Sequence, residues 1–141
     1  MNRKELFVKY MNDVTNIALA TGSKDGANVR AVSIGFDEQT PDRIYFVTFG
    51  QSAKAMEMKA DPKVTFIPFP DKSDTEVTIR VHGVAEPADI SVERIAELVA
   101  RHLPEYGAQI PAMGEHAGLY QIRYESAEVS LGMNPPEVIT F

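Results

Sequence analysis

The stretch that decides the fold runs from residue 29 to residue 62 and reads VRAVSIGFDEQTPDRIYFVTFGQSAKAMEMKADP. It predicts two strands, over Val29–Phe36 and Ile44–Phe49, because β-branched and aromatic residues are grouped between turn signals. Ser52 is then placed as the N-cap of a helix, and Asp61-Pro62 closes that helix because proline cannot continue its hydrogen bonding. The stretch therefore predicts two strands that lead directly into a short helix.

Patterns on either side of this stretch predict the remaining elements. Helical spacing of apolar residues indicates helices over Arg3–Met11 and Val92–Leu103, with Ser91 as N-cap of the second. Residues 104–117 are rich in Gly, Ala and Pro, which predicts a loop. The other strands are expected at Asn16–Thr21, Lys63–Phe69, Glu76–Ala85, Gly118–Tyr124 and Ala127–Leu131, before a β-prone tail.

Short connections favour antiparallel pairing. The Asp25-Gly26 pair typifies a tight hairpin turn, so strands 16–21, 29–36 and 44–49 are expected to form a consecutive meander. Pro68 predicts that its strand ends at an edge or a bulge. The sum is an α+β fold in one domain over residues 1–141. We expect six to seven antiparallel strands in a small barrel, with two to four peripheral helices, because closure removes exposed strand edges.

Composition excludes several classes of function. The chain has no cysteine, which rules out disulfides and thiolate metal sites and suits a reducing cytoplasm. A formal net charge of −6 disfavours broad attraction to nucleic acid or to anionic membrane. No signal peptide and no apolar run of membrane-spanning length is present. We expect a cytoplasmic protein that binds neither nucleic acid nor membrane.

The familiar catalytic motifs are also missing. The sequence holds no GxSxG, Walker, GxGxxG or HExxH pattern. Its three histidines, His82, His102 and His116, are not at metal-ligand spacing, and His102 suits the C-terminal turn of a helix as a cation. We therefore expect no metal site and no catalytic side chain.

The informative position is Lys54. It falls in the first turn of the predicted helix, where a cation is unfavourable because a helix begins with about half a positive elementary charge. A bound phosphate would resolve this conflict, since the Ser52 hydroxyl, the Lys54 ammonium and the first-turn N–H groups would converge on it. The competing interpretation is that Lys54 extends into water.

The strand 29–36 adds a second signal. Ala31, Ser33 and Gly35 share one face and form a strip of small side chains, which we expect to lie beside Thr48 of the neighbouring strand. A flat aromatic ring could lie against this strip and bond to backbone groups, with Arg30 as a further donor. Alternatively, the small residues only let a helix approach closely.

These segments, in this order, resemble the pyridoxamine 5′-phosphate oxidase-like superfamily of FMN-binding split barrels. The similarity spans Asn16 to Glu86 and is most specific from Tyr45 to Pro62. It implies FMN as the cofactor, with Ser52 and Lys54 on the phosphate and residues 30–33 along the isoalloxazine ring. The full set of FMN-binding residues that it implies is Arg30, Ala31, Val32, Ser33, Val47, Thr48, Gln51, Ser52, Lys54 and Thr78.

The resemblance also implies a homodimer with flavin sites at the subunit interface. Two departures argue against true vitamin B6 oxidase activity. Ala53 stands where the oxidase commonly has an arginine beside its phosphate-binding lysine, and the oxidase's Arg- and Trp-rich C-terminal segment is absent. The first hypothesis is a small FMN-dependent oxidoreductase, with NAD(P)H or a small molecule as redox partner. The alternatives are a carrier that binds FMN, haem or the deazaflavin F420 without turnover, and a structural barrel with no ligand.

Overall fold

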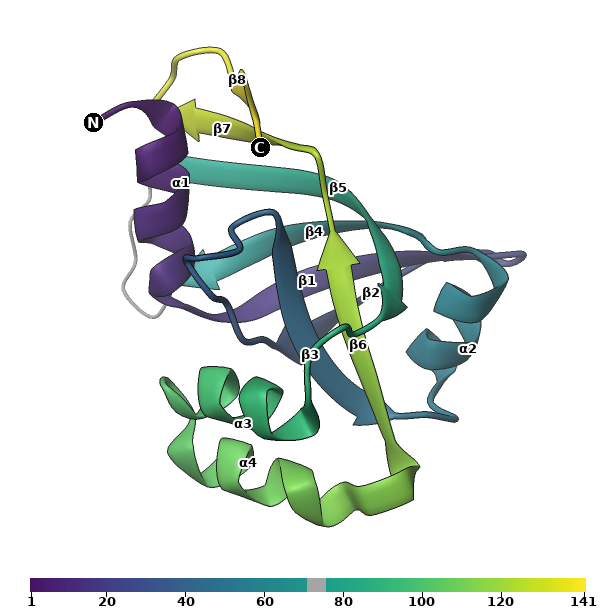
Figure 1. Cartoon of the computed structure of the whole chain (residues 1–141). Helices are drawn as coiled ribbons and strands as arrows, with labels where there is room; N and C mark the ends of the chain where they lie inside the picture. The colour runs from purple at the N-terminus through teal and green to yellow at the C-terminus, as the bar shows by residue number, and fades with distance from the viewer. Residues whose placement is uncertain (71–75) are drawn as a thin grey trace.

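The computed structural model describes residues 1–70 and 76–141 (Figure 1). The helices are α1 (Arg3–Asn12), α2 (Ala53–Ala60), α3 (Val92–Ala100) and α4 (Pro104–Gln109), followed by a 3₁₀ segment, η1 (Ile110–His116). The strands are β1 (Val14–Ser23), β2 (Gly26–Ser33), β3 (Arg43–Phe49), β4 (Lys63–Pro70), β5 (Val77–Pro87), β6 (Ala117–Arg123), β7 (Ser126–Leu131) and β8 (Glu137–Thr140).

Antiparallel pairs join all the strands into one sheet, whose main path is β2-β1-β4-β5-β6-β3. Strand β7 pairs with the first part of β5, and β8 pairs with β7. The path bends round until its two ends meet, because Gly35, just after β2, forms a bridge with Tyr45 of β3. This arrangement confirms the predicted α+β antiparallel split barrel. The described residues form eight strands, one more than the expected maximum, because the tail also pairs.

The predicted meander is wrong in its second half. β1 and β2 form the expected hairpin, with Ala18 opposite Ala31. β3 does not continue it, since its whole length pairs with β6, from Arg43 opposite Arg123 to Phe49 opposite Ala117. β2 also ends at Ser33 instead of continuing to Phe36. The bridge at Gly35 is therefore the one backbone pairing between the second and third strands among the described residues.

Local signals predicted α1, α2 and α3 correctly and missed the helical region that follows α3. The Ser52 hydroxyl accepts a hydrogen bond from Ala55 N at 3.3 Å and caps α2, and Ser91 caps α3 in the same way. Residues 104–116 are not the predicted loop, because they form α4 and η1. His102 has a contact beyond its predicted place near the end of a helix, since its Nε2 donates a hydrogen bond to the Asn12 carbonyl oxygen at 2.7 Å.

The core lies inside the curved sheet. β5 alternates as predicted, with Val77, Ile79 and Val81 buried and the residues between them exposed. Pro68 has no partner on the β5 side, where the pairing of β4 with β5 covers only residues 63–66. A second apolar cluster lies between β3 and the helices α3 to η1, and contains Tyr45, Val47, Ile95, Leu98, Val99 and Ile110.

A substitution at Gly35 tests the packing of α3 over the bridge that joins the two ends of the sheet. A Cβ at this position would lie 2.7 Å from Leu98 Cβ and 3.2 Å from Val99 N, so α3 would have to move away from the bridge. We expect Gly35→Ala to lower the free energy of unfolding by about 1 to 3 kcal/mol, measured by urea denaturation. Gly22→Ala is the control, because its Cβ would make only an ordinary contact at 3.6 Å with Asp61 Oδ2. Equal midpoints for the two variants would contradict this packing.

Candidate functional site

The site lies where the barrel is split. β2 and β3 end the sheet path on opposite sides, and beyond the Gly35 bridge they diverge instead of pairing. A pocket of about 700 Å³ lies elsewhere, but a second pocket, of about 610 Å³, opens between these two strands. Its volume is within the usual range of ligand sites. The residues that line it are Ala31, Val32, Ser33, Val47, Thr48, Phe49, Lys54, Tyr106, Gln109, Ile110, Ala112 and Met113.

We call this second pocket the seam pocket, because it lies between the unpaired edges of β2 and β3. Backbone groups face it from both strands. Gly35 N donates to Tyr45 O at 2.8 Å, and Tyr45 N donates to Gly35 O at 3.0 Å. Because backbone groups of an antiparallel strand alternate in direction, the N–H and C=O groups of Ala31 and Ser33 point the same way as those of Gly35. Those of Val47 point the same way as those of Tyr45. No described strand pairs with them there, so the seam offers donors and acceptors to a flat ligand.

Lys54 is the one charged side chain among the lining residues. It projects from the first turn of α2, where the sequence predicted it. Burial, and then the charge of the nearby Arg30, lowers the pKa of Lys54 below its ordinary value. No hydrogen bond or ion pair connects Lys54 to another residue in the described parts of the chain. A partly desolvated cation without a counter-ion is suited to hold an anion.

Arg30, predicted as a donor to the ligand, has two protein partners in the single chain. Its Nη2 lies 3.2 Å from Oε2 of Glu57 on α2, and its Nη1 donates to the Thr21 hydroxyl at 2.6 Å. Glu57 also accepts hydrogen bonds from Thr21 and from Asn28. The Thr21 hydroxyl, with Arg30 and Asn28, holds the pKa of Glu57 below its usual value. Arg30 is not among the lining residues of the pocket, and it contacts a carboxylate that the sequence analysis did not single out.

Most of the other predicted residues lie at the pocket. Ala31, Val32, Ser33, Val47 and Thr48 line the pocket together with Lys54. Ser52 lies beside them, with its hydroxyl 3.2 Å from Oγ1 of the buried Thr48, and it also caps α2. Gln51 is exposed in the turn before the helix.

Thr78 is not brought to this pocket in the single chain. It is exposed on β5 opposite Ser130 of β7, and lines a separate groove of about 210 Å³. Thr78 therefore lies outside the lining of the seam pocket.

Sequence reasoning missed one wall of the pocket. Tyr106, Gln109, Ile110, Ala112 and Met113 come from α4 and η1, the region predicted as a loop. Gly107 fixes this wall, because a Cβ there would lie 2.6 Å from Ala100 Cβ and 2.7 Å from Ala96 O of α3. The available signal was Pro104, which is typical of the first turn of a helix.

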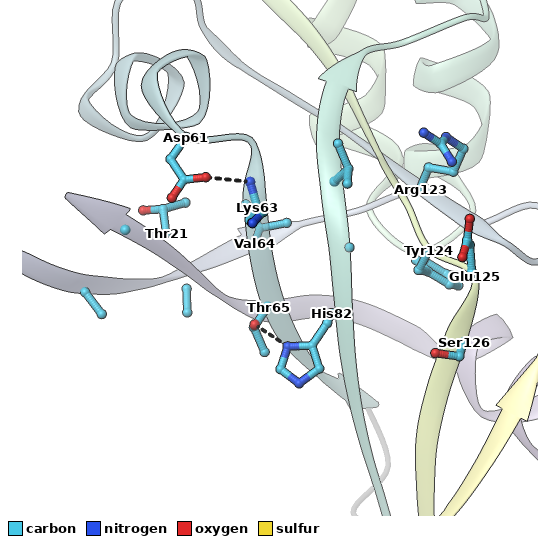
Figure 2. Close-up of a pocket in the computed structure, with 15 residues that line it drawn as sticks. Thr21, Asp61, Lys63, Val64, Thr65, His82, Arg123, Tyr124, Glu125 and Ser126 are labelled. Atoms are coloured by element: carbon cyan, nitrogen blue, oxygen red, sulfur yellow. Dashed lines mark hydrogen bonds between the residues drawn. The ribbon is translucent and has the colours of Figure 1, made fainter.

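The pocket of about 700 Å³ lies on another part of the barrel, between β1, β4, β5 and the β6–β7 turn. Figure 2 shows that Thr65 turns toward His82, with 2.8 Å between Thr65 Oγ1 and His82 Nδ1. The charged side chains on this pocket are of both signs, and Arg123 is paired with Glu86 at 2.8 Å. None of the ten predicted site residues lines it.

The described residues contain no group of three or more histidine, cysteine or acidic side chains placed to hold a metal ion. None of their helices has the length and apolar character needed to cross a bilayer.

Solved structures show similar folds at low sequence identity. A heme binding protein from Mycobacterium smegmatis superposes with a TM-score of 0.77 at 14% identity, over 99% of this chain and 58% of that protein. The General Stress Protein 26 of Bacillus anthracis str. Sterne gives 0.74 at 16% identity, over the whole of both chains. A NimC/NimA family protein from Clostridium acetobutylicum gives 0.64 at 17% identity, over 99% of this chain and 90% of the other.

No curated protein matches the chain. The family model described as pyridoxamine 5′-phosphate oxidase-like matches residues 10–135, which include every strand except β8 and all of the seam pocket. The chain belongs to the pyridoxamine 5′-phosphate oxidase-like family.

Proposed function

We propose that the protein binds FMN in the seam pocket and uses it for hydride or electron transfer. The observation that carries this proposal is the combination of unpaired strand edges with one unpartnered cation. Ala31, Ser33 and Val47 offer backbone groups to the edge of a flat ring, while Lys54 offers a charge to a phosphate. Membership of the family supports flavin as the ligand.

In this proposal the protein binds and orients, and FMN, when bound, supplies the redox chemistry. The small side chains of β2 leave room for the ring. Thr48 and Ser52 place their hydroxyls 3.2 Å apart between the seam and the first turn of α2, where a ribityl chain would pass. Tyr106 and Met113 on the opposite wall limit the access of water. The histidines lie outside the pocket lining, so no histidine is assigned as acid or base.

Haem is the second candidate, because one structural neighbour is a heme binding protein. The lining residues include no histidine, the commonest axial ligand, although Met113 and Tyr106 could each ligate iron. The deazaflavin F420 would use the same ring and phosphate contacts. An absorption spectrum of the isolated protein separates haem from the flavins.

Turnover separates an oxidoreductase from a carrier. We expect the FMN-loaded protein to oxidise NAD(P)H, or to pass electrons from a chemical reductant to a small acceptor, at a rate above that of free FMN. A yellow protein that does neither is a carrier. A colourless protein that does not take up added FMN, F420 or haem contradicts the proposed function.

Lys54 is the direct test of the phosphate contact. We expect Lys54→Met to weaken FMN binding by about 10- to 100-fold, because a charge-assisted contact is lost, and to leave riboflavin binding nearly unchanged. Fluorescence titration with both flavins measures this. Lys59→Met, at the exposed far end of the same helix, is the matched control. An equal loss of both flavins would place the phosphate elsewhere.

We also propose that two copies of the chain associate through the outer face of β1, β2 and β4. Side chains in register on this face are small at the centre, where Ala18 lies between Ala31 and Ile67. The large apolar side chains on this face include Val29 and Phe69, which are 67% and 51% exposed, and its polar side chains include Asn16, Ser33 and Thr65. Exposed apolar side chains grouped on one face of a small protein are typical of an interface. It adjoins the seam pocket through Ala31 and Ser33, so a second copy would complete the site.

The association is tested by mass in solution. We expect light scattering to give twice the chain mass of 15.6 kDa, and Ala18→Arg to give a monomer, because it places a charge at the centre of the face. FMN affinity should fall together with dimerisation. Ala108→Arg, on an exposed position of α4, should remain dimeric. A wild-type monomer that binds FMN at full affinity would contradict the shared site.

A further inference from the structure

Glu57 lies one turn after Lys54 on α2 and gathers contacts from two strands. Its carboxylate accepts the hydroxyl of Thr21 from β1 and, at 2.6 Å, Nδ2 of Asn28 from β2. Arg30 Nη2 is 3.2 Å away, and the side chains of Arg30 and Glu57 are only 22% and 16% exposed. Because Arg30 also donates to Thr21, the three side chains form a closed, largely covered cluster.

This cluster lies beside the seam pocket and acts on it electrostatically. Arg30 directly precedes Ala31 of the pocket lining on β2, and Glu57 follows Lys54 by three residues on α2, so the cluster lies beside the pocket. After burial, the positive charge of Arg30 is the second cause that lowers the pKa of Lys54. A charge that acts on Lys54 through space also acts, with the opposite sign, on an anion held by Lys54. The carboxylate of Glu57 offsets that charge. Its role in holding α2 is secondary, because Ala55 and Met58 anchor the helix in the core at 0% and 3% exposure.

We propose that Glu57 sets the affinity of the seam pocket for anions by neutralising Arg30, so that Lys54 alone presents positive charge to the ligand. This inference rests on the proposed function and adds to it a residue that determines specificity. Glu57 does not line the pocket and acts through Arg30, so it is a positioning residue and not a catalytic one.

A charge cycle tests the proposal. The quantity measured is the preference for FMN over riboflavin, taken as the ratio of their dissociation constants, because this ratio isolates the phosphate. Glu57→Gln should raise the preference about three- to tenfold, since Arg30 keeps its charge without a counter-ion. Arg30→Met should lower it by a similar factor, because an unpaired carboxylate remains. The double variant should return to within about twofold of the wild type.

The control is Glu97→Gln, which breaks the exposed ion pair with Arg94 on α3 and should leave the preference unchanged. A structural role for Glu57 would give a different pattern. Both flavins would bind more weakly in Glu57→Gln, and the second substitution would not restore the preference. That result, or a preference that falls in Glu57→Gln, overturns the proposal.

A second readout does not depend on flavin. If the wild type binds neither FMN nor riboflavin, the proposed function has failed, and the charge balance is then measured on Lys54 itself. NMR titration of ¹³C-methylated lysines, with Lys54 assigned from Lys54→Arg, should give a lower pKa for Lys54 in Glu57→Gln than in the wild type. An unchanged pKa shows that Glu57 does not control the charge at this site.

Discussion

The pair of backbone hydrogen bonds between Gly35 and Tyr45 is the constraint on which the site depends. It joins the two ends of a bent sheet at a single point. Had pairing continued in the same register, Ser33 would lie opposite Val47 and Ala31 opposite Phe49, and the barrel would be closed. Instead these residues line a pocket. The absence of a side chain at Gly35 is what lets α3 pack directly over this junction.

α2 carries two charged side chains with different surroundings. Lys54 lines the pocket and has no hydrogen-bond or ion-pair partner among the described residues, whereas Glu57, one turn later, accepts hydrogen bonds from three donors on β1 and β2. Ala55 and Met58 hold the helix in the core, and the carboxylate of Glu57 adds contacts to β1 and β2. A protein with a formal net charge of −6 can present a local cation in this way because charged side chains act mainly over short range in salt solution.

The sequence predicted the parts of the site that local rules control. Ser52 as N-cap, Lys54 in the first turn and the small residues of β2 follow from propensities and from alternation, and all were placed correctly.

Long-range pairing is different. The partner of β3 is β6, about seventy residues later, and no turn signal encodes that choice. The contact between Arg30 and Glu57 could not be predicted either, because a strand and a turn separate the two residues in the sequence and only packing brings them together. The wall of α4 and η1 was not predicted because Gly107 and Pro111 normally interrupt helices. Here Gly107 lets α4 pack closely against α3, and Pro111 lies in the first turn of η1.

The divergence of β2 from β3 has a consequence for the protein before it meets a ligand. Two strand edges with unsatisfied hydrogen-bonding capacity face each other across the seam pocket, and such edges readily pair with an extended chain. An occupant that bonds to both edges therefore does more than fill space, since it completes the hydrogen bonding of the sheet. The empty protein should be more prone to self-association during storage and more easily opened by heat than the occupied one, so that supply of the ligand would govern how long the molecule lasts in the cell.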